Sequence, residues 1–236
     1  TDGTTDTSFG GGDGIVTTAI GTGNDIGRSI TLQADGKILV AGHGVVGGNQ
    51  DYVLVRYNAD GTLDTGFSDD GIVVTVIGTA HDSAYSVNVQ TDGRILLAGL
   101  SNNDFSLVRY NSNGSLDTSF GGDGIVTTDI AGGTDLGRAM TILSDGKILV
   151  AGQVGTLSSS DFALIRYNND GTLDNSFGGG DGIVITATSA GTDIAQAMCV
   201  QPDGKIVVSG YARNGLNDDF ILVRYKSDGT LDITFD

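Results

Sequence analysis

Residues 116–128 read LDTSFGGDGIVTT, and the core of this stretch, Asp-Gly-Ile-Val, occurs four times in the chain. The four copies begin at Asp13, Asp70, Asp123 and Asp181, so the successive spacings are 57, 53 and 58 residues. Three further anchors keep the same period: a DGKI or DGRI turn, an Arg-Tyr pair and a GTLD or GSLD segment. Self-similarity at a fixed period of this size indicates a repeat architecture.

Each repeat carries four short runs that have the character of strands. In the first repeat these runs are GIVTTAI at 14–20, RSITLQ at 28–33, KILVAG at 37–42 and YVLVRY at 52–57. They are β-branched or alternating and are bounded by Gly, Asn and Asp, as strands usually are. The Asp-Gly pairs supply the positive φ angle that a tight hairpin needs. Four strands in a unit of this length match one blade of a β-propeller.

The sequence therefore predicts an all-β fold, a single β-propeller over residues 1–236 with four blades of four antiparallel strands. The repeats run approximately over 14–70, 71–123, 124–181 and 182–236. If the strand at 28–33 is innermost, the chain opens with a lone outer strand at 14–20, and the last blade, 194–225, lacks one. We therefore expect residues 14–20 to complete the last blade and close the ring. The alternatives are an open array, a part of a longer propeller, or two chains that pair into eight blades.

Composition limits the partners of the chain. It has 236 residues, 12 Lys+Arg against 29 Asp+Glu, and a formal net charge of -17. This acidic protein should repel nucleic acid and anionic membrane surfaces, which need basic patches, and should favour cations or a basic partner. No apolar run approaches 18 residues, so membrane insertion is not expected. The lone cysteine, Cys199, lies in a strand-like run and is expected in the core.

Three segments carry a resemblance to a known family: residues 116–128, DGKILVAG at 145–152 and DFALIRY at 161–167. They resemble the delta-60 repeat, a tandem repeat of large secreted or surface proteins of bacteria. The resemblance covers nearly the whole chain and implies a propeller-like fold and an extracellular or cell-surface location. It implies no particular activity, because the family shares none. At one position the repeats differ, since Arg28 and Arg138 are replaced by Tyr85 and Gln196.

The loops between blades carry one aspartate each, a set that comprises Asp25, Asp82, Asp135 and Asp193. The loops from second to third strand end in a second set on the same face: Asp51, Asp104, Asp161 and Asp219. Fourfold repetition would turn the first set into a ring on the axis, where carboxylates repel one another and Ca²⁺ or Mg²⁺ relieves the repulsion. The competing interpretation is that each Asp caps backbone N–H groups of its own loop.

The repeated Arg-Tyr pairs and phenylalanines have a mainly structural interpretation. Each Arg, at 56, 109, 166 and 224, is expected to pair with a nearby Asp between blades, with an anionic sugar as the alternative partner. The phenylalanines at 67, 120, 177 and 235 are expected to be core residues.

The segments that differ between repeats are the better candidates for ligand binding, because function on repeat scaffolds tends to lie in variable loops. They span 43–50, 153–160 and 211–218. The candidate ligand-binding residues are Tyr211, Arg213, Asn214, Asn217, His43 and His81. The first four suit stacking on a sugar ring and hydrogen bonding to its hydroxyls. No zinc, nucleophile-elbow or nucleotide-binding motif occurs.

These observations predict a non-catalytic binding or structural module of a secreted or cell-surface bacterial protein, with a glycan or protein ligand and a divalent cation on the axis. The chain is expected to be a monomer or part of a longer chain. The alternative function is a polysaccharide lyase or glycosidase that uses Tyr211, Arg213, His43 and His81. A third possibility is a scaffold segment of a longer adhesin or envelope protein.

Overall fold

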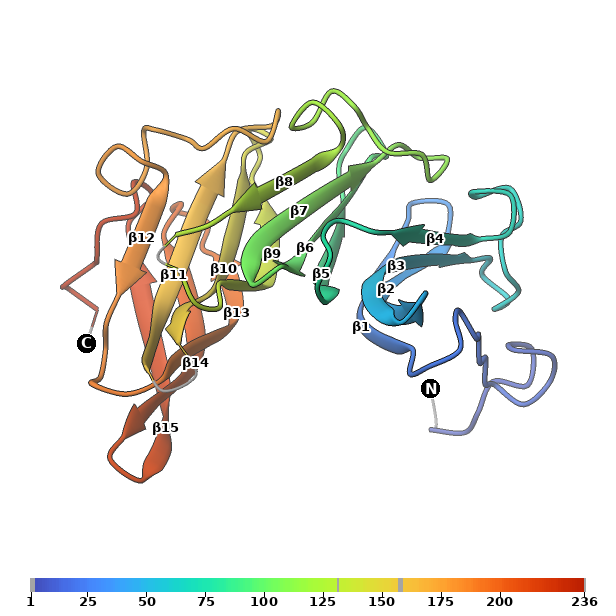
Figure 1. Ribbon diagram of the computed structural model, residues 1–236, viewed down its shortest axis with the longest axis horizontal. Coiled ribbons are helices and arrows are strands. Elements are labelled where there is room, and N and C mark those ends of the chain that lie inside the picture. Colours follow the sequence, from blue (N-terminus) through green and yellow to red (C-terminus); the bar gives the residue numbers. More distant parts are fainter. Residues whose placement is uncertain (1–2, 131, 157–158, 236) are drawn as a thin grey trace.

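The computed structural model describes residues 3–130, 132–156 and 159–235, and these form fifteen strands and no helix. The strands make four antiparallel sheets, each from one sequence repeat, and the sheets stand side by side along an arc (Figure 1). The sequence prediction of an all-β repeat fold with antiparallel blades is therefore confirmed. No helix among the described residues is long and apolar enough to cross a membrane.

The blades follow one another in chain order. Blade 1 contains β1 (Ile26–Leu32), β2 (Ile38–Val46), β3 (Asn49–Tyr57) and β4 (Ile72–Thr75). Blade 2 contains β5 (Asp82–Val89), β6 (Ile95–Ser101), β7 (Asp104–Tyr110) and β8 (Ile125–Thr128). Blade 3 contains β9 (Leu136–Ile142), β10 (Ile148–Thr156), β11 (Ser159–Tyr167) and β12 (Ile183–Thr186). Blade 4 contains β13 (Asp193–Val200), β14 (Ile206–Asn214) and β15 (Asn217–Tyr225), and so has three strands in the described chain.

The Asp-Gly pairs form the predicted turns between first and second strands. Gly36 has a φ angle of +84° and donates its N–H to the carbonyl oxygen of Gln33. The carboxylate of Asp35 accepts the N–H of Lys37 at 3.2 Å and so closes the turn from the other side. A residue with a side chain adopts this φ only under strain, whereas glycine adopts it freely.

The prediction of long loops is wrong in part, because most residues of these segments extend the strands of hairpins. β2 and β3 stay paired to Val46 and Asn49, so the segment 43–50 is strand with a two-glycine turn. The segment 211–218 is likewise strand up to Asn214 and again from Asn217. Of the segment 153–160, residues 157 and 158 lie outside the described residues. Tyr211 and His43 are therefore strand residues.

The core lies between blades. Leu39 and Leu54 of blade 1 pack with Val87 and Leu97 of blade 2, and the same arrangement joins blades 2 and 3 and blades 3 and 4. Blades 2 and 3 therefore bury one face against the preceding blade and the other against the following blade, whereas blades 1 and 4 each have one neighbour. Cys199, expected in the core, is exposed, because it lies in the last blade, which no blade follows.

The Arg-Tyr motif fastens each blade to the next one. Arg109 donates from Nε to Asp117 Oδ2 at 2.7 Å, and its Nη1 donates to the backbone oxygen of Asn169 in blade 3. Its guanidinium also stacks on Phe120, with Cζ 4.5 Å from the ring centroid. The predicted Asp partner is confirmed, but it lies in the same blade. Blades 1, 3 and 4 repeat the pair as Arg56–Asp64, Arg166–Asp174 and Arg224–Asp232.

The structure does not show the predicted closure of the ring. Residues 14–20 pair with no strand, and they lie beside blade 1 at one end of the arc, while β15 lies at the other end (Figure 1). Thr18 Oγ1 accepts a hydrogen bond from Tyr57 Oη at 2.8 Å, and Gly10 donates to the oxygen of Asp60 at 3.0 Å. The segment therefore packs on the first blade of its own chain and not on the last.

Candidate axial binding site

The first strand of every blade contains a β-bulge. Its pairing with the second strand skips one residue in each blade, and the skipped residues are Arg28, Tyr85, Arg138 and Gln196. A bulge redirects a side chain out of the regular alternation of the sheet, and bulges are frequent beside functional sites. The bulge is thus the position at which the repeats carry Arg, Tyr, Arg and Gln in turn.

The first strands are neighbours, because β5 contacts both β1 and β9, and β9 contacts β13. They thus line the inner side of the arc, and three bulge residues meet there. The guanidinium carbons of Arg28 and Arg138 lie 4.3 and 5.6 Å from the ring centroid of Tyr85. We call Arg28, Tyr85 and Arg138 the axial cluster.

Neutral groups surround the two axial arginines. Arg138 donates to Gln153 Oε1 at 3.2 Å from Nη2, and Arg28 Nε donates to Ser83 Oγ at 3.2 Å. Ser83 Oγ also lies 2.8 Å from Nδ1 of the buried His43. Burial, and then the charge of Arg28, lower the pKa of His43, so this imidazole is neutral at pH 7.

The axial arginines have no acidic partner in the part of the chain that the structure describes, although the chain holds 29 acidic residues. Within residues 3–130, 132–156 and 159–235 neither Arg28 nor Arg138 takes part in an ion pair, whereas the repeated arginines and lysines of the blades do. Burial lowers the pKa of Arg138, which means that its charge is held at a cost in desolvation. The axial cluster can therefore gain from an anionic group.

The six predicted ligand residues separate into two groups. Tyr211, Arg213, Asn214 and Asn217 lie together on the β14–β15 hairpin, where Arg213 Nε donates to Asp218 Oδ1 at 2.9 Å. An open pocket of about 400 Å³ beside this hairpin is lined by Tyr211, Gln196 and Phe220 among others. His43 belongs to β2 and contacts the hydroxyl of Ser83, which also accepts a hydrogen bond from Arg28. His81 is an exposed residue just before β5.

The four aspartates predicted as metal ligands each serve their own loop. Asp25 Oδ2 accepts the N–H of Ile20 at 2.8 Å, and Asp82, Asp135 and Asp193 accept the corresponding N–H groups of their loops. Among the described residues one group of three carboxylates comes close enough to share a metal ion: Asp104, Asp129 and Asp135, with one oxygen of each within 4.8 Å of the others. The structure thus joins Asp135 to Asp104 and Asp129.

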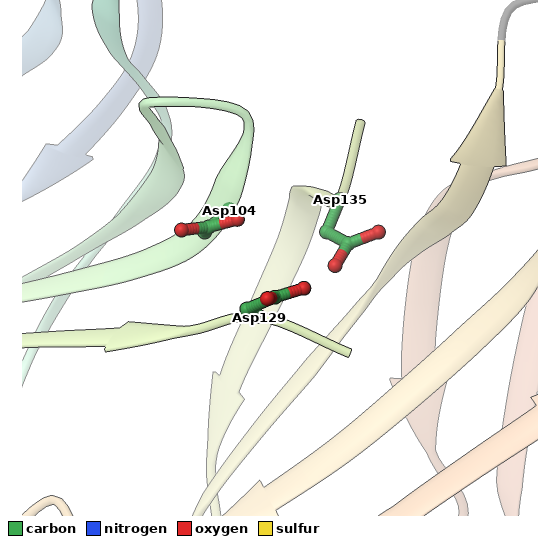
Figure 2. Close-up of side chains that lie close together, drawn as sticks. All are labelled: Asp104, Asp129 and Asp135. Carbon is green, nitrogen blue, oxygen red and sulfur yellow. The ribbon is translucent and has the colours of Figure 1, made fainter. Parts of the chain in front are cut away.

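This carboxylate trio lies at the junction of blades 2 and 3 (Figure 2). Asp104 begins β7, Asp129 follows β8, and Asp135 precedes β9. Asp135 is fully buried, and its Oδ1 accepts no hydrogen bond from the described residues. Burial, together with the charges of Asp129 and Asp135, raises the pKa of Asp104. Three carboxylates with a free buried oxygen are a donor set that hard divalent cations prefer.

The axial cluster and Asp129 were both missed in the sequence. The sequence did show that one position varies between repeats, as Arg28, Tyr85, Arg138 and Gln196. It did not show that this position is a bulge, because a bulge leaves no mark in the strand pattern. Asp129 has no acidic counterpart, since Ala19, Val76 and Ala187 follow the equivalent threonines. A comparison of the repeats therefore does not single out Asp129.

Four successive antiparallel blades with neighbouring first strands define the class of the protein as a tandem-repeat β-propeller. The chain belongs to the family described as "Domain of unknown function (DUF5122) beta-propeller", whose model matches residues 33–67, 90–120, 143–177 and 201–235. No curated protein sequence matches the chain.

Solved structures resemble the chain at low sequence identity. A protein of unknown function from Bacteroides caccae superposes with a TM-score of 0.52 at 16% identity, over 87% of this chain and 65% of that protein. A gluconolactonase from Xanthomonas campestris, XC5397, gives a TM-score of 0.45 at 15% identity, over 86% of this chain and 59% of that one. A Lactobacillus plantarum protein gives 0.44 at 10% identity, over 88% and 57%. The chain thus spans less than two thirds of each of these proteins.

Proposed function

We propose that the chain is a non-catalytic binding module of an extracellular or surface protein, and that it binds a glycan with carboxylate groups at the axial cluster. The observation that carries the proposal is that two arginines lie close to the ring of Tyr85 and that neither has a carboxylate partner among the described residues. An anion bound there gains charge-assisted hydrogen bonds that the chain itself does not provide.

The chemistry of the cluster favours a sugar acid over a simple ion. A guanidinium binds a carboxylate with two parallel hydrogen bonds, and a tyrosine ring offers an apolar face to a sugar. The net charge of -17 opposes long polyanions, because their charges extend beyond the cluster into the acidic field of the protein. A short oligosaccharide with one to three carboxylates fits both conditions.

Titration calorimetry with a galacturonic acid trimer tests this function. The wild type should bind the trimer, binding should weaken as salt rises from 50 to 500 mM, and the neutral methyl ester should bind at least about tenfold more weakly. Arg28→Gln/Arg138→Gln should abolish binding, whereas Arg213→Gln on the predicted hairpin should not. Equal affinity for acid and ester, or unchanged binding by the double variant, would reject the axial site.

The same samples test the other functions that the sequence left open. Release of unsaturated or reducing sugar by the wild type would favour the polysaccharide-acting enzyme. Binding of an acidic peptide with the same dependence on Arg28 and Arg138 would change the ligand class from glycan to protein. If Arg213→Gln alone abolished glycan binding, the binding site would be the β14–β15 hairpin and not the axial cluster.

We also propose that Ca²⁺ or Mg²⁺ binds the carboxylate trio of Asp104, Asp129 and Asp135. The metal site is supported by the buried oxygen of Asp135 that accepts no hydrogen bond from the described residues. It is also supported by the raised pKa of Asp104, which burial and then the charges of Asp129 and Asp135 cause. Millimolar CaCl₂ should raise the melting temperature and a chelator should reverse the rise. Protons compete for the same oxygens, so the rise should shrink as pH falls through the raised pKa of Asp104.

Matched variants separate this site from general effects of salt. Asp129→Asn should remove the response to CaCl₂, and Asp69→Asn, which changes an exposed aspartate outside the trio, should keep it. An equal response in both variants would contradict a site at the trio.

A further inference from the structure

The last blade exposes the surface that other blades bury against a following blade. The first blade exposes the surface that other blades bury against a preceding blade. At the last blade, β15 pairs only with β14, whereas β3, β7 and β11 each have an outer partner among the described strands. Phe220 is fully exposed and Leu222 is 58% exposed. Their counterparts in the other blades are buried against a following blade: Tyr52, Phe105 and Phe162, and Leu54, Leu107 and Leu164.

The first blade exposes the complementary surface. Ile30 is 67% exposed, although its counterparts Val87 and Met140 are 4% and 7% exposed because a preceding blade covers them. A cavity of about 90 Å³ lies beside it and is lined by Gly27 and Val40 among others. At the junction of blades 2 and 3, the phenylalanine of the preceding blade occupies this place.

That placement of the phenylalanine follows from the contacts of Gly137, the counterpart of Gly27. A Cβ atom on Gly137 would lie 3.1 Å from Cδ1 of Phe105 and 2.8 Å from Cγ1 of Val150. Val150 is in turn the counterpart of Val40. The cavity at Gly27 and Val40 thus has the position and the walls that receive Phe105 one junction further along the chain.

Residues 15–18 already hold the position of an outer strand from a preceding blade. The Thr18–Tyr57 hydroxyl contact of 2.8 Å repeats the contacts Thr75–Tyr110, Thr128–Tyr167 and Thr186–Tyr225, at 2.6, 2.8 and 2.7 Å. The bond from Gly10 N to Asp60 O repeats Gly121–Asp170 and Gly178–Asp228. The sequence of residues 15–18, IVTT, is identical to that of β8. Among the described residues no strand pairs with residues 15–18 from the inner side of that blade.

We propose that a second copy of this chain supplies the inner strands of that blade, so that blade 4 of one copy docks on blade 1 of the next. Phe220 and Leu222 of the first copy then cover Gly27, Ile30 and Val40 of the second. Residues 15–18 of the second copy pair with β15 of the first as its fourth strand, with Thr18 opposite Phe220 and Ile15 opposite Val223, the register of β7 with β8. Such a head-to-tail contact gives a ring if the rotation closes and a filament if it does not. The proposal is independent of the axial ligand.

A complementation experiment tests the head-to-tail geometry. The wild type should elute in light-scattering chromatography with a mass of two or more chains. Phe220→Asp and Ile30→Asp should each give monomers, because each removes one half of the contact, and both residues are exposed in the single chain, so that the fold is retained. An equimolar mixture of the two variants should give a dimer and nothing larger, since one intact junction remains.

Controls make the outcomes decisive. Ile185→Asp changes an exposed apolar residue of β12 in blade 3, which lies at neither end of the arc, and should keep the wild-type mass. A monomeric wild type at 100 µM, or variants that fail to complement each other, would overturn the proposal. Loss of association through Phe220→Asp without any effect of Ile30→Asp would indicate a symmetric contact and would also overturn it.

Disulfide trapping identifies which copy provides the strand. Thr17→Cys and Ile221→Cys, in a Cys199→Ser background, should form a disulfide between chains and give a ladder on a non-reducing gel. Ser106→Cys/Thr127→Cys, the equivalent pair already joined in blade 2, should form the disulfide within one chain. A disulfide within one chain at 17 and 221 would mean that the chain closes on itself, and free thiols would mean that this pairing does not occur. Either result contradicts docking between copies.

Discussion

Arg109 is the largest side chain that the fold buries almost completely, with 2% of its residue surface exposed. Its guanidinium is satisfied by Asp117, by the backbone of blade 3 and by the ring of Phe120. A buried ion pair adds little stability against an apolar replacement of the whole pair, but loss of one partner leaves a buried charge without compensation. The repeated Arg-Asp pairs therefore fix the angle between successive blades, because a shifted neighbour would break the backbone bond.

Arg109→Ala should lower the free energy of unfolding by about 3 kcal/mol, because the buried carboxylate of Asp117 loses its partner at 2.7 Å and keeps only the more exposed Arg94 at 3.2 Å. Arg213→Ala is the matched control: its pair with Asp218 is exposed, so the loss should be below about 1 kcal/mol. Urea unfolding followed by circular dichroism measures both. Similar losses for the two variants would contradict the structural role of the buried pair.

The same carboxylates set the acid limit of stability. Hydrogen bonds from Ser119 and the charge of Arg109 outweigh burial and lower the pKa of Asp117, and Lys147 with Ser176 does the same for Asp174. A depressed folded-state pKa contributes stability above the unfolded value, about 3.9, and this stability is lost as pH falls further. The stability that Asp117 and Asp174 contribute should thus be level from pH 7 to about pH 5 and fall steeply below pH 4. The fall should be shallower in Asp117→Asn, and a wild-type maximum below pH 4 would contradict the assignment.

At the scale of the residue, the sequence predicted more about structure than about ligands. The burial of Phe67, Phe120 and Phe177 and the pairing of each repeated Arg with Asp followed from position and repetition. Phe235, also expected in the core, is 37% exposed, because it belongs to the last blade, which no blade follows. The axial cluster did not, because a bulge moves Arg28 and Arg138 out of the alternation on which side-chain directions are predicted. Asp129 was missed because its partners come from two other segments of the chain.

At the scale of the element, the period-2 patterns and the Asp-Gly turns gave the strands and their antiparallel order. Strand ends were less predictable. The glycines at 47 and 48 read as a loop, but they form a two-residue hairpin turn that lets β2 and β3 continue to Val46 and Asn49. The bulge in each first strand also depends on a contact that is invisible in sequence, the close approach of a glycine in the second strand to a carbonyl of the first.

Gly152 makes that close approach in blade 3, where an added Cβ would overlap the carbonyl oxygen of Leu136. Gly152→Ala should therefore destabilise the protein by more than about 2 kcal/mol, since a backbone atom cannot move aside as a flexible side chain can. Gly47→Asn is the control, because this turn position has open space and a φ of +64° that Asn tolerates. Thermal unfolding of both variants checks the difference, and a neutral Gly152→Ala would mean that the bulge geometry is wrong.

At the scale of the whole molecule, the repeat number was visible in the sequence and the closure was not. A strand such as residues 14–20 has the same sequence whether it completes the last blade of its own chain or the last blade of another copy. The choice depends on the rotation between successive blades, which the buried Arg-Asp junctions set and which no local pattern encodes. In the structure this rotation leaves the first and last blades at opposite ends of the arc (Figure 1).

Distances between equivalent turns measure this rotation most directly. Ala34, Thr91, Ser144 and Pro202 are exposed and occupy the same turn in blades 1 to 4. Nitroxide pairs at these positions, in a Phe220→Asp/Cys199→Ser background diluted with unlabelled chain, give intrachain distances by double electron–electron resonance. An open arc predicts that the distance from blade 1 increases steadily from blade 2 to blade 3 to blade 4. A distance from blade 1 to blade 4 equal to that from blade 1 to blade 2 would show a closed four-bladed ring and contradict this structure.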